Sequence, residues 1–135
     1  MNKPSPLPAD GQQFEKYSAD QGRDGDGQFR MRAERASEKA ATHSTIALAA
    51  SRVAMKPNST SADHELAAEA HRLAHYSHMS GKYAHDAEAG TDRVAGEIKS
   101  AKQHESEARR HYSAAQDHIA LSNKHTKMMN KENSN

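Results

Sequence analysis

Histidine recurs at every seventh residue in the second half of this chain, and this spacing constrains the fold more than any other feature. Eight of the ten histidines fall on two such series: His64, His71, His78 and His85, then His104, His111, His118 and His125. A strict seven-residue repeat is typical of α-helices that supercoil to keep one face toward a partner helix. The repeat therefore predicts packed, coiled-coil-like helices.

The apolar residues are mostly too small to build a thick globular core. Hydrophobic residues make up 34% of the 135-residue chain, but 24 of them are alanine and only 12 are Leu, Ile, Val or Phe. Burial contributes only about 25 cal/mol per Å² of apolar surface, and alanine offers little surface. Two interpretations remain: a chain disordered in isolation, or helices stabilised by packing on each other or on a partner. The near-zero net charge and the many strong helix formers favour the second.

Proline, glycine and capping residues divide the chain. Residues 1–27 are rich in Pro, Gly, Gln and Asp, which predicts an extended or disordered N-terminal arm. The region 28–130 is expected to be helical, with helices at about 28–56, 62–89 and 93–129, and residues 131–135 form a frayed tail. Pro57 ends the first helix, Ser61 is the expected N-cap of the second, and Gly90 is the expected break after it. One unbroken helix over 62–129 is the alternative.

Together these features predict an all-α fold, either an elongated alanine-rich helical hairpin or a three-helix bundle, preceded by the arm. The first helix shows a stripe of small residues with spacings of three and four. Its members are Phe29, Ala33, Ala36, Ala40, His43, Ala47, Ala50 and Ala54. This spacing places them on one helix face, which is expected to pack against the other helices.

Two different stripes of the later helices could form the packing seam. One alternates the heptad histidines with a residue three positions further on, such as Ala67, Ala74 and Gly81. The other is more apolar and places the histidines, half-exposed, along its flank. On hydrophobic grounds we expect the second stripe to form the contact, and its partner-binding residues are predicted to be Leu66, Leu73, Val94, Ile98, Tyr112 and Ile119.

Histidines could also carry chemistry of their own. His71, His75 and His78 stand at i, i+4 and i+7 on one helix face, a spacing that can bind Zn²⁺, Ni²⁺ or Cu²⁺. No HExxH signature accompanies them, so the plainer interpretation is that histidine is the residue this repeat places beside its seam. Protonating all ten histidines would raise the formal charge from +1 to +11, which makes an acid response conceivable.

Several functional classes are disfavoured by the sequence. The chain has no cysteine, its 19 basic and 18 acidic residues give no basic footprint for nucleic acid or membrane, and no apolar run or secretory signal appears. Nucleophile-elbow and phosphate-loop motifs are missing, so we expect a cytoplasmic protein that is not an enzyme and needs no cofactor. The leading hypothesis is a non-enzymatic helical interaction or assembly protein that self-associates or docks on a larger complex, including as a structural subunit of a particle. The alternative is a histidine-rich metal-binding protein.

Overall fold

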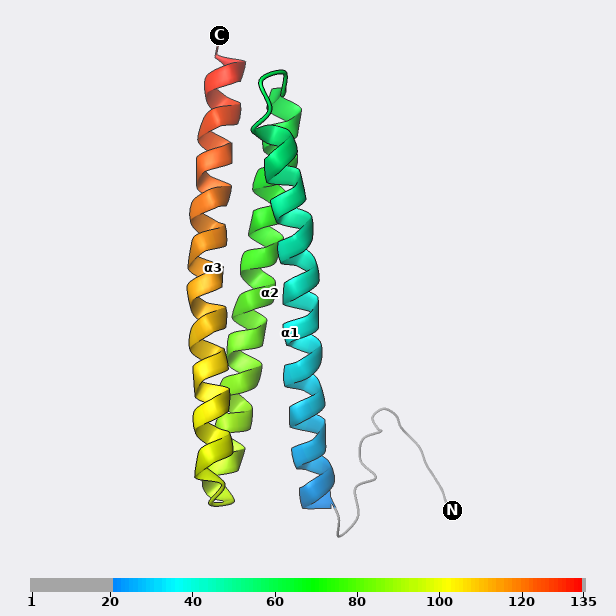
Figure 1. Ribbon diagram of the computed structural model, residues 1–135, viewed down its shortest axis with the longest axis vertical. Helices are drawn as coiled ribbons and strands as arrows, with labels where there is room; N and C mark the ends of the chain where they lie inside the picture. The colour runs from blue at the N-terminus through cyan, green and yellow to red at the C-terminus, as the bar shows by residue number, and fades with distance from the viewer. Residues whose placement is uncertain (1–20, 135) are drawn as a thin grey trace, which may run out of the picture.

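The protein is an all-α bundle of three long helices lying side by side (Figure 1). The computed structural model describes the backbone of residues 21–134 and the side chains of residues 31–134. The helices are α1 (Gln21–Ala54), α2 (Ser61–Val94) and α3 (Ile98–Asn133), and consecutive helices run in opposite directions. The three-helix prediction is confirmed. None of the described helices contains a stretch long and apolar enough to cross a membrane.

The start of α1 differs from the prediction. The arm was expected to extend to residue 27, but residues 21–27 already belong to α1. Residues 1–20, the remainder of the predicted arm, lie outside the part of the chain that the structure describes.

The first turn is defined by a capping box. Helix α1 ends at Ala54 and the chain reverses through residues 55–60 around Pro57. The Asp63 backbone N–H donates to the Thr60 hydroxyl at 3.3 Å, while the Thr60 backbone N–H donates to the Asp63 carboxylate at 2.9 Å. Two N–H groups of the helix start are thereby satisfied. The N-cap is therefore Thr60, and the predicted Ser61 is the first helical residue.

The second turn lies at Gly96, so the predicted break at Gly90 is wrong. Gly90 lies within α2, where glycine costs only a modest amount of helix stability. Gly96 has a φ of 81°, the left-handed region that glycine enters without a steric penalty. The guanidinium of Arg93 then bridges the turn to the Glu105 carboxylate with two hydrogen bonds of 2.8 Å. The unbroken helix over 62–129 is excluded as well.

Alanine lines the surfaces on which the helices meet. Helix α2 packs closely on both neighbours, whereas the described backbones of α1 and α3 stay further apart. Buried alanines recur every seven residues on α1 and α3: Ala33, Ala40, Ala47 and Ala54, then Ala101, Ala108 and Ala115. Such small side chains let α1 and α3 each approach α2 closely. The small-residue stripe predicted for α1 is confirmed for these positions, while the side chain of Phe29 lies outside the described residues.

The core contains the histidines, so the predicted seam is wrong. His71 is 0% exposed and His125 is 1% exposed, whereas Leu66 is 63% exposed and Val94 is 92% exposed. The hydrophobic ranking failed because it treats each side chain alone, and an imidazole whose two nitrogens are hydrogen-bonded avoids most of the cost of burial. The stripe of α2 that alternates histidines with Ala67, Ala74 and Gly81 is the one that faces the neighbouring helices.

The ring of His111 packs against Gly81, where a larger residue would not fit. A Cβ atom built there would lie 3.0 Å from three atoms of the His111 ring, closer than such contacts normally come. A Cβ atom at Gly90, by contrast, would meet nothing within 4 Å. The packing of His111 therefore excludes a side chain at Gly81, whereas Gly90 has room for one.

We expect Gly81→Ala to lower the free energy of unfolding by about 1–3 kcal/mol, because the added methyl group overpacks the core. Gly90→Ala is the matched control and should raise it by roughly 0.5–1 kcal/mol through helix propensity. Urea unfolding followed by circular dichroism measures both. Equal effects of the two substitutions would contradict the packing of His111 on Gly81.

Candidate functional site

The histidines of α2 and α3 meet ring to ring in the middle of the bundle. In each pair the two Nδ1 atoms share a hydrogen bond of 2.7–3.0 Å. The pairs are His64 with His125, His71 with His118, His78 with His111, and His85 with His104. Because each step of seven residues along α2 is matched by a step of seven in the opposite direction along α3, the heptads produce four equivalent rungs.

Serines of α1 link one rung to the next through the outer nitrogens of the rings. The Ser37 hydroxyl lies 2.8 Å from His85 Nε2 and 2.9 Å from His111 Nε2. The Ser44 hydroxyl lies 2.7 Å from His78 Nε2 and 2.8 Å from His118 Nε2. Each of these serines therefore joins a histidine of α2 to a histidine of the neighbouring rung on α3.

A third serine continues the series. The Ser51 hydroxyl lies 2.7 Å from His125 Nε2. We call these four histidine rungs and the three serines the histidine–serine ladder. The serines of the ladder were not predicted from the sequence, although Ser37, Ser44 and Ser51 are themselves spaced by seven and this repeat is the signal that could have revealed them.

Ring stacking reinforces the ladder between rungs. His71 stacks on His125 with ring centroids 5.8 Å apart and planes 10° apart, and His78 stacks on His118 at 5.5 Å and 15°. Offset-stacked rings at such separations attract each other beyond their area of contact. The rings are thus held both at their edges and on their faces.

Burial keeps the core imidazoles neutral. Removal from water, reinforced by neighbouring histidines, lowers the pKa of His71 and of His78 from 6.5 to about 4. Burial is also the largest cause that lowers the pKa values of four further rings of the ladder: His85, His111, His118 and His125. At neutral pH each of these rings carries one N–H donor and one bare acceptor nitrogen.

Acidic residues stand at both ends of the ladder. His104 lies close to Glu88 and Asp92, with one ligand-type atom of each within 4.8 Å of the others, and the Ser100 hydroxyl donates to Asp92 at 2.6 Å. At the far end, His64 Nε2 is 3.9 Å from a carboxylate oxygen of Glu132. Asp92 and Glu132 occupy the next heptad positions after the histidine series, so the repeat itself replaces imidazole by carboxylate at these ends.

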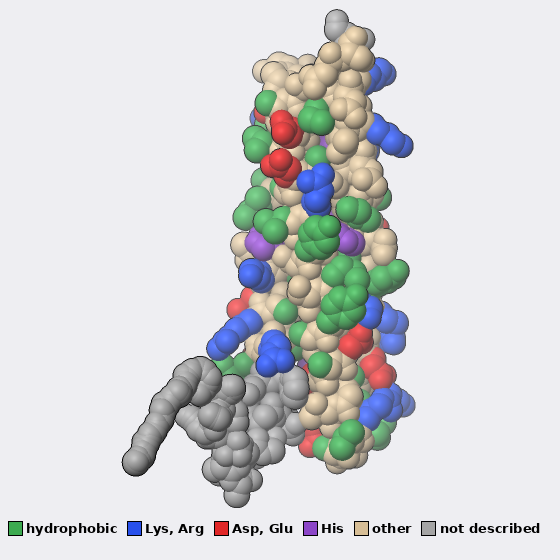
Figure 2. Space-filling model, turned by 180° about the vertical axis from the view of Figure 1, so that it is seen from behind, with side chains coloured by type: hydrophobic (Ala, Val, Ile, Leu, Met, Phe, Trp, Pro, Cys, Tyr) green, Lys and Arg blue, Asp and Glu red, His purple; other side chains and the backbone are tan. Residues whose placement is uncertain are grey.

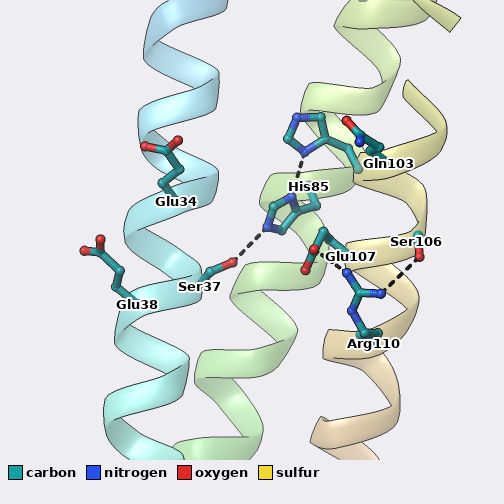
Figure 3. Close-up of a pocket in the computed structure, with 9 residues that line it drawn as sticks. Glu34, Ser37, Glu38, His85, Gln103, Ser106, Glu107 and Arg110 are labelled. Atoms are coloured by element: carbon teal, nitrogen blue, oxygen red, sulfur yellow. Dashed lines mark hydrogen bonds and ion pairs between the residues drawn. The ribbon is translucent and has the colours of Figure 1, made fainter. Parts of the chain in front are cut away.

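A groove opens beside one end of the ladder, between α1 and α3. It has a volume of about 710 Å³. Figure 3 shows Ser37 of α1 directed at His85, with Glu107 and Arg110 of α3 on the other side. The carboxylates of Glu34, Glu38 and Glu107 line it, so it is an acidic opening onto otherwise buried rings.

The histidines predicted to bind metal do not share a common point. The Nδ1 atoms of His71 and His78 belong to different rungs, and His75 Nδ1 donates to the Ala115 carbonyl oxygen at 2.8 Å. Among the described residues, two other sets have metal-ligand spacing: His85 with Glu107 and His111, and Glu88 with Asp92 and His104. In the first set Ser37 already occupies both Nε2 atoms. We assign no metal to either set, and the metal prediction stays untested.

The predicted partner-binding residues lie outside the helix contacts. Leu66, Leu73, Val94, Ile98 and Tyr112 are exposed, and Ile119 is half-buried. Their role in binding a partner stays a prediction. Comparison of the chain with protein-family models, with curated proteins and with solved structures gives no match.

The ladder predicts a strong acid dependence of stability. Because the folded pKa of His71 and of His78 is about 4 and the reference value is 6.5, the unfolded chain binds more protons between these values. Stability is therefore complete above about pH 6.5 and falls as the pH drops toward 4. At about pH 4.5 the loss should be roughly 2–3 kcal/mol for each of these two rings.

Urea unfolding at about pH 7.5 and about pH 4.5 measures this loss. His71→Gln removes one titrating ring and should flatten the pH dependence. His75→Gln is the comparison, because that ring lies outside the ladder and only adds to the lowering of the His118 pKa, and it should change the slope less than His71→Gln does. An equal free energy of unfolding at both pH values would refute the neutral core.

Proposed function

We propose that this chain is a non-enzymatic helical interaction protein that associates with a second copy of itself through the outer face of α2. The proposal is supported by the exposure of apolar residues on that face and by the symmetry of their spacing. Three of the residues that the sequence predicted as contacts, Leu66, Leu73 and Val94, belong to it.

Large apolar side chains gather on the side of α2 opposite to the ladder. Leu66, Leu73 and Val94 repeat at seven-residue intervals or multiples of seven, and Tyr76 and Tyr83 form a parallel row beside them. All five are more than half exposed. At about 100° per residue, both rows lie on the face of α2 turned away from the histidines. Figure 2 shows hydrophobic side chains gathered near the middle of one face of the bundle.

Exposure on this scale is unusual for a protein that works alone. Isolated apolar side chains on a surface need no explanation, but several large ones along one helix face favour an interaction site. Burying one such leucine or valine side chain contributes about 1.5–3 kcal/mol. Several of them buried together would offset the entropy lost on association. The bundle core does not use these residues, so they are available to a partner.

The spacing of the row supports a second copy as the partner, and this observation carries the proposal. Leu66 and Val94 stand at equal distances along the chain on either side of Ser80, and Tyr76 and Tyr83 flank it almost equally. Two copies of α2 packed antiparallel about Ser80 would therefore place Leu66 of one beside Val94 of the other. A two-fold interface requires this kind of self-complementary patch. The small side chain at the centre lets the two helices approach closely.

Charged residues border the apolar row, as expected at the rim of an interface. Lys82 donates to Asp86 at 2.6 Å, and its ammonium group lies 5.0 Å from the centre of the Tyr83 ring. An ion pair this exposed contributes little to stability by itself. It limits the apolar surface on one side, which favours a defined register of the two copies over indiscriminate aggregation.

We expect the wild-type chain to be a dimer by size-exclusion chromatography with light scattering, and Leu73→Asp combined with Tyr76→Asp to be a monomer. Two carboxylates in an apolar contact cannot both be desolvated without a large cost. Because both side chains are exposed in the bundle, far-UV circular dichroism should report unchanged helicity.

The matched control is Ile46→Asp, which places a carboxylate at an exposed apolar site on α1 that is 53% exposed. This variant should remain a dimer. A monomeric wild-type chain, or a dimer that survives the double substitution on α2, would overturn the proposal.

A further inference from the structure

The hydrogen bonds of the ladder form one uninterrupted series over most of the bundle. Each link measures 2.7–2.9 Å. In order, the series runs through His104, His85, Ser37, His111, His78, Ser44, His118 and His71. The series passes from a ring of α3 to a ring of α2 and then to a serine of α1, and this order repeats along the bundle without a missing hydrogen bond.

The protons of this series are forced into one common direction. A neutral imidazole has one donor and one acceptor nitrogen, and a serine hydroxyl donates one hydrogen bond while accepting another. If His78 receives at Nε2 from Ser44, it must donate at Nδ1 to His111, and His111 must then donate at Nε2 to Ser37. The tautomer of one ring therefore fixes that of every other ring in the series.

The acidic groups at the two ends select opposite directions. Carboxylates attract N–H donors, so Glu88 and Asp92 favour donors pointing toward His104. At the other end Glu132 favours an N–H on His64 Nε2. The short segment made of Ser51, His125 and His64 should therefore point toward Glu132, away from the long series.

The place where the two directions part is visible in the structure. His71 Nε2 is fully buried and has no hydrogen-bond partner. By the heptad repeat, Ser51 stands to His71 as Ser44 stands to His78, yet no hydrogen bond joins them. Donors that point away on both sides leave two acceptors facing each other, with no proton between them. One added proton on His71 Nε2 would supply the missing link to Ser51.

We propose that the ladder is a proton wire that connects the acidic groove beside His104 with Glu132 at the opposite end of the bundle. From His64 to His85 it spans about 30 Å along α2. At each hop an N–H or O–H bond breaks as the next one forms. Uptake at the groove uses the reversed orientation of the long series, in which His104 presents a bare nitrogen to the groove and the N–H at His71 Nε2 points toward Ser51. For each proton that then enters at His104, one leaves His64 to Glu132, so the number of protons bound is unchanged and the long series returns to its resting orientation. This proposal does not depend on dimerisation.

The charges around the ladder suit this path. At the groove, Glu34 and Glu38 of α1 and Glu107 of α3 would collect protons from solvent, and Arg110 contacts Glu107 beside them. Along the shaft, Asp86 on α2 and Asp117 on α3 favour a passing cation, whereas His75 and Lys124 oppose one. The half-buried His43 is bonded to Ser77 and lies outside the path.

Nitrogen-15 NMR of the imidazole rings in the full chain tests the common direction. At neutral pH we expect His71, His78 and His85 to carry the proton on Nδ1, and His111 and His118 to carry it on Nε2. Beyond the gap the assignment should reverse, with His64 protonated at Nε2 and His125 at Nδ1. Neighbouring rungs whose tautomers are unrelated would overturn the wire.

Exchange of the ring protons with water tests the hopping itself. The proton shared by His78 and His111 should exchange at least about tenfold faster than nearby backbone amides, whose exchange requires the bundle to open. Ser37→Ala combined with Ser44→Ala cuts both links to this rung and should slow the exchange to the amide rate. Because each rate is compared with amides of the same molecule, a loss of stability does not mimic the effect.

The matched control is Ser37→Thr with Ser44→Thr, which keeps both hydroxyls and should keep exchange fast. If the double alanine variant does not fold, Ser44→Ala alone serves instead. It should make the tautomer of His118 independent of the tautomer of His78, while both rings remain neutral. Ring protons of the wild-type chain that exchange at the amide rate would refute the proposal.

Discussion

The structure depends on one interaction: the hydrogen bond between neutral, buried imidazole rings and the hydroxyls or rings beside them. A polar group taken out of water without a partner costs several kcal/mol, so a core of histidines is tolerable only when nearly every nitrogen is bonded. The four rungs and three serines meet this requirement at all but one buried ring nitrogen among the described residues, that of His71. Burial then keeps the rings neutral, and neutrality preserves the donor and acceptor on each ring that the bonds require.

This dependence makes helix register decisive. A shift of one residue in α1 would move its three ladder serines by about 100° around the helix and leave five ring nitrogens without partners. The capping box at Thr60 and the left-handed Gly96 fix where the turns occur, and Arg93 holds the second turn by its bonds to Glu105. Short, well-defined turns therefore stabilise the core, because they fix the register of the helices and so determine which serine bonds to which histidine.

The sequence predicted the elements better than the seam. The strict repeat of histidine correctly indicated packed helices, since periodicity follows directly from helix geometry. It could not show which face is buried, because that depends on partners supplied by other helices. Leu73 looked like a core residue and is 52% exposed, while His71 looked like a border residue and is fully buried. Ser44 carried no visible signal alone and acquires its meaning only from the two rings that it joins across the bundle.

A core of leucine at these positions would bury more apolar surface and would not lose stability in acid. The chain contains such residues, but it places Leu66 and Leu73 on the outside. Departures from the usual hydrophobic arrangement cost stability, so they are expected mainly at sites where they serve a function. The inverted arrangement therefore keeps the two proposed roles on different sides of α2. Under the two proposals, the outer face of α2 meets a partner and the interior holds and passes protons, so a change to one need not disturb the other.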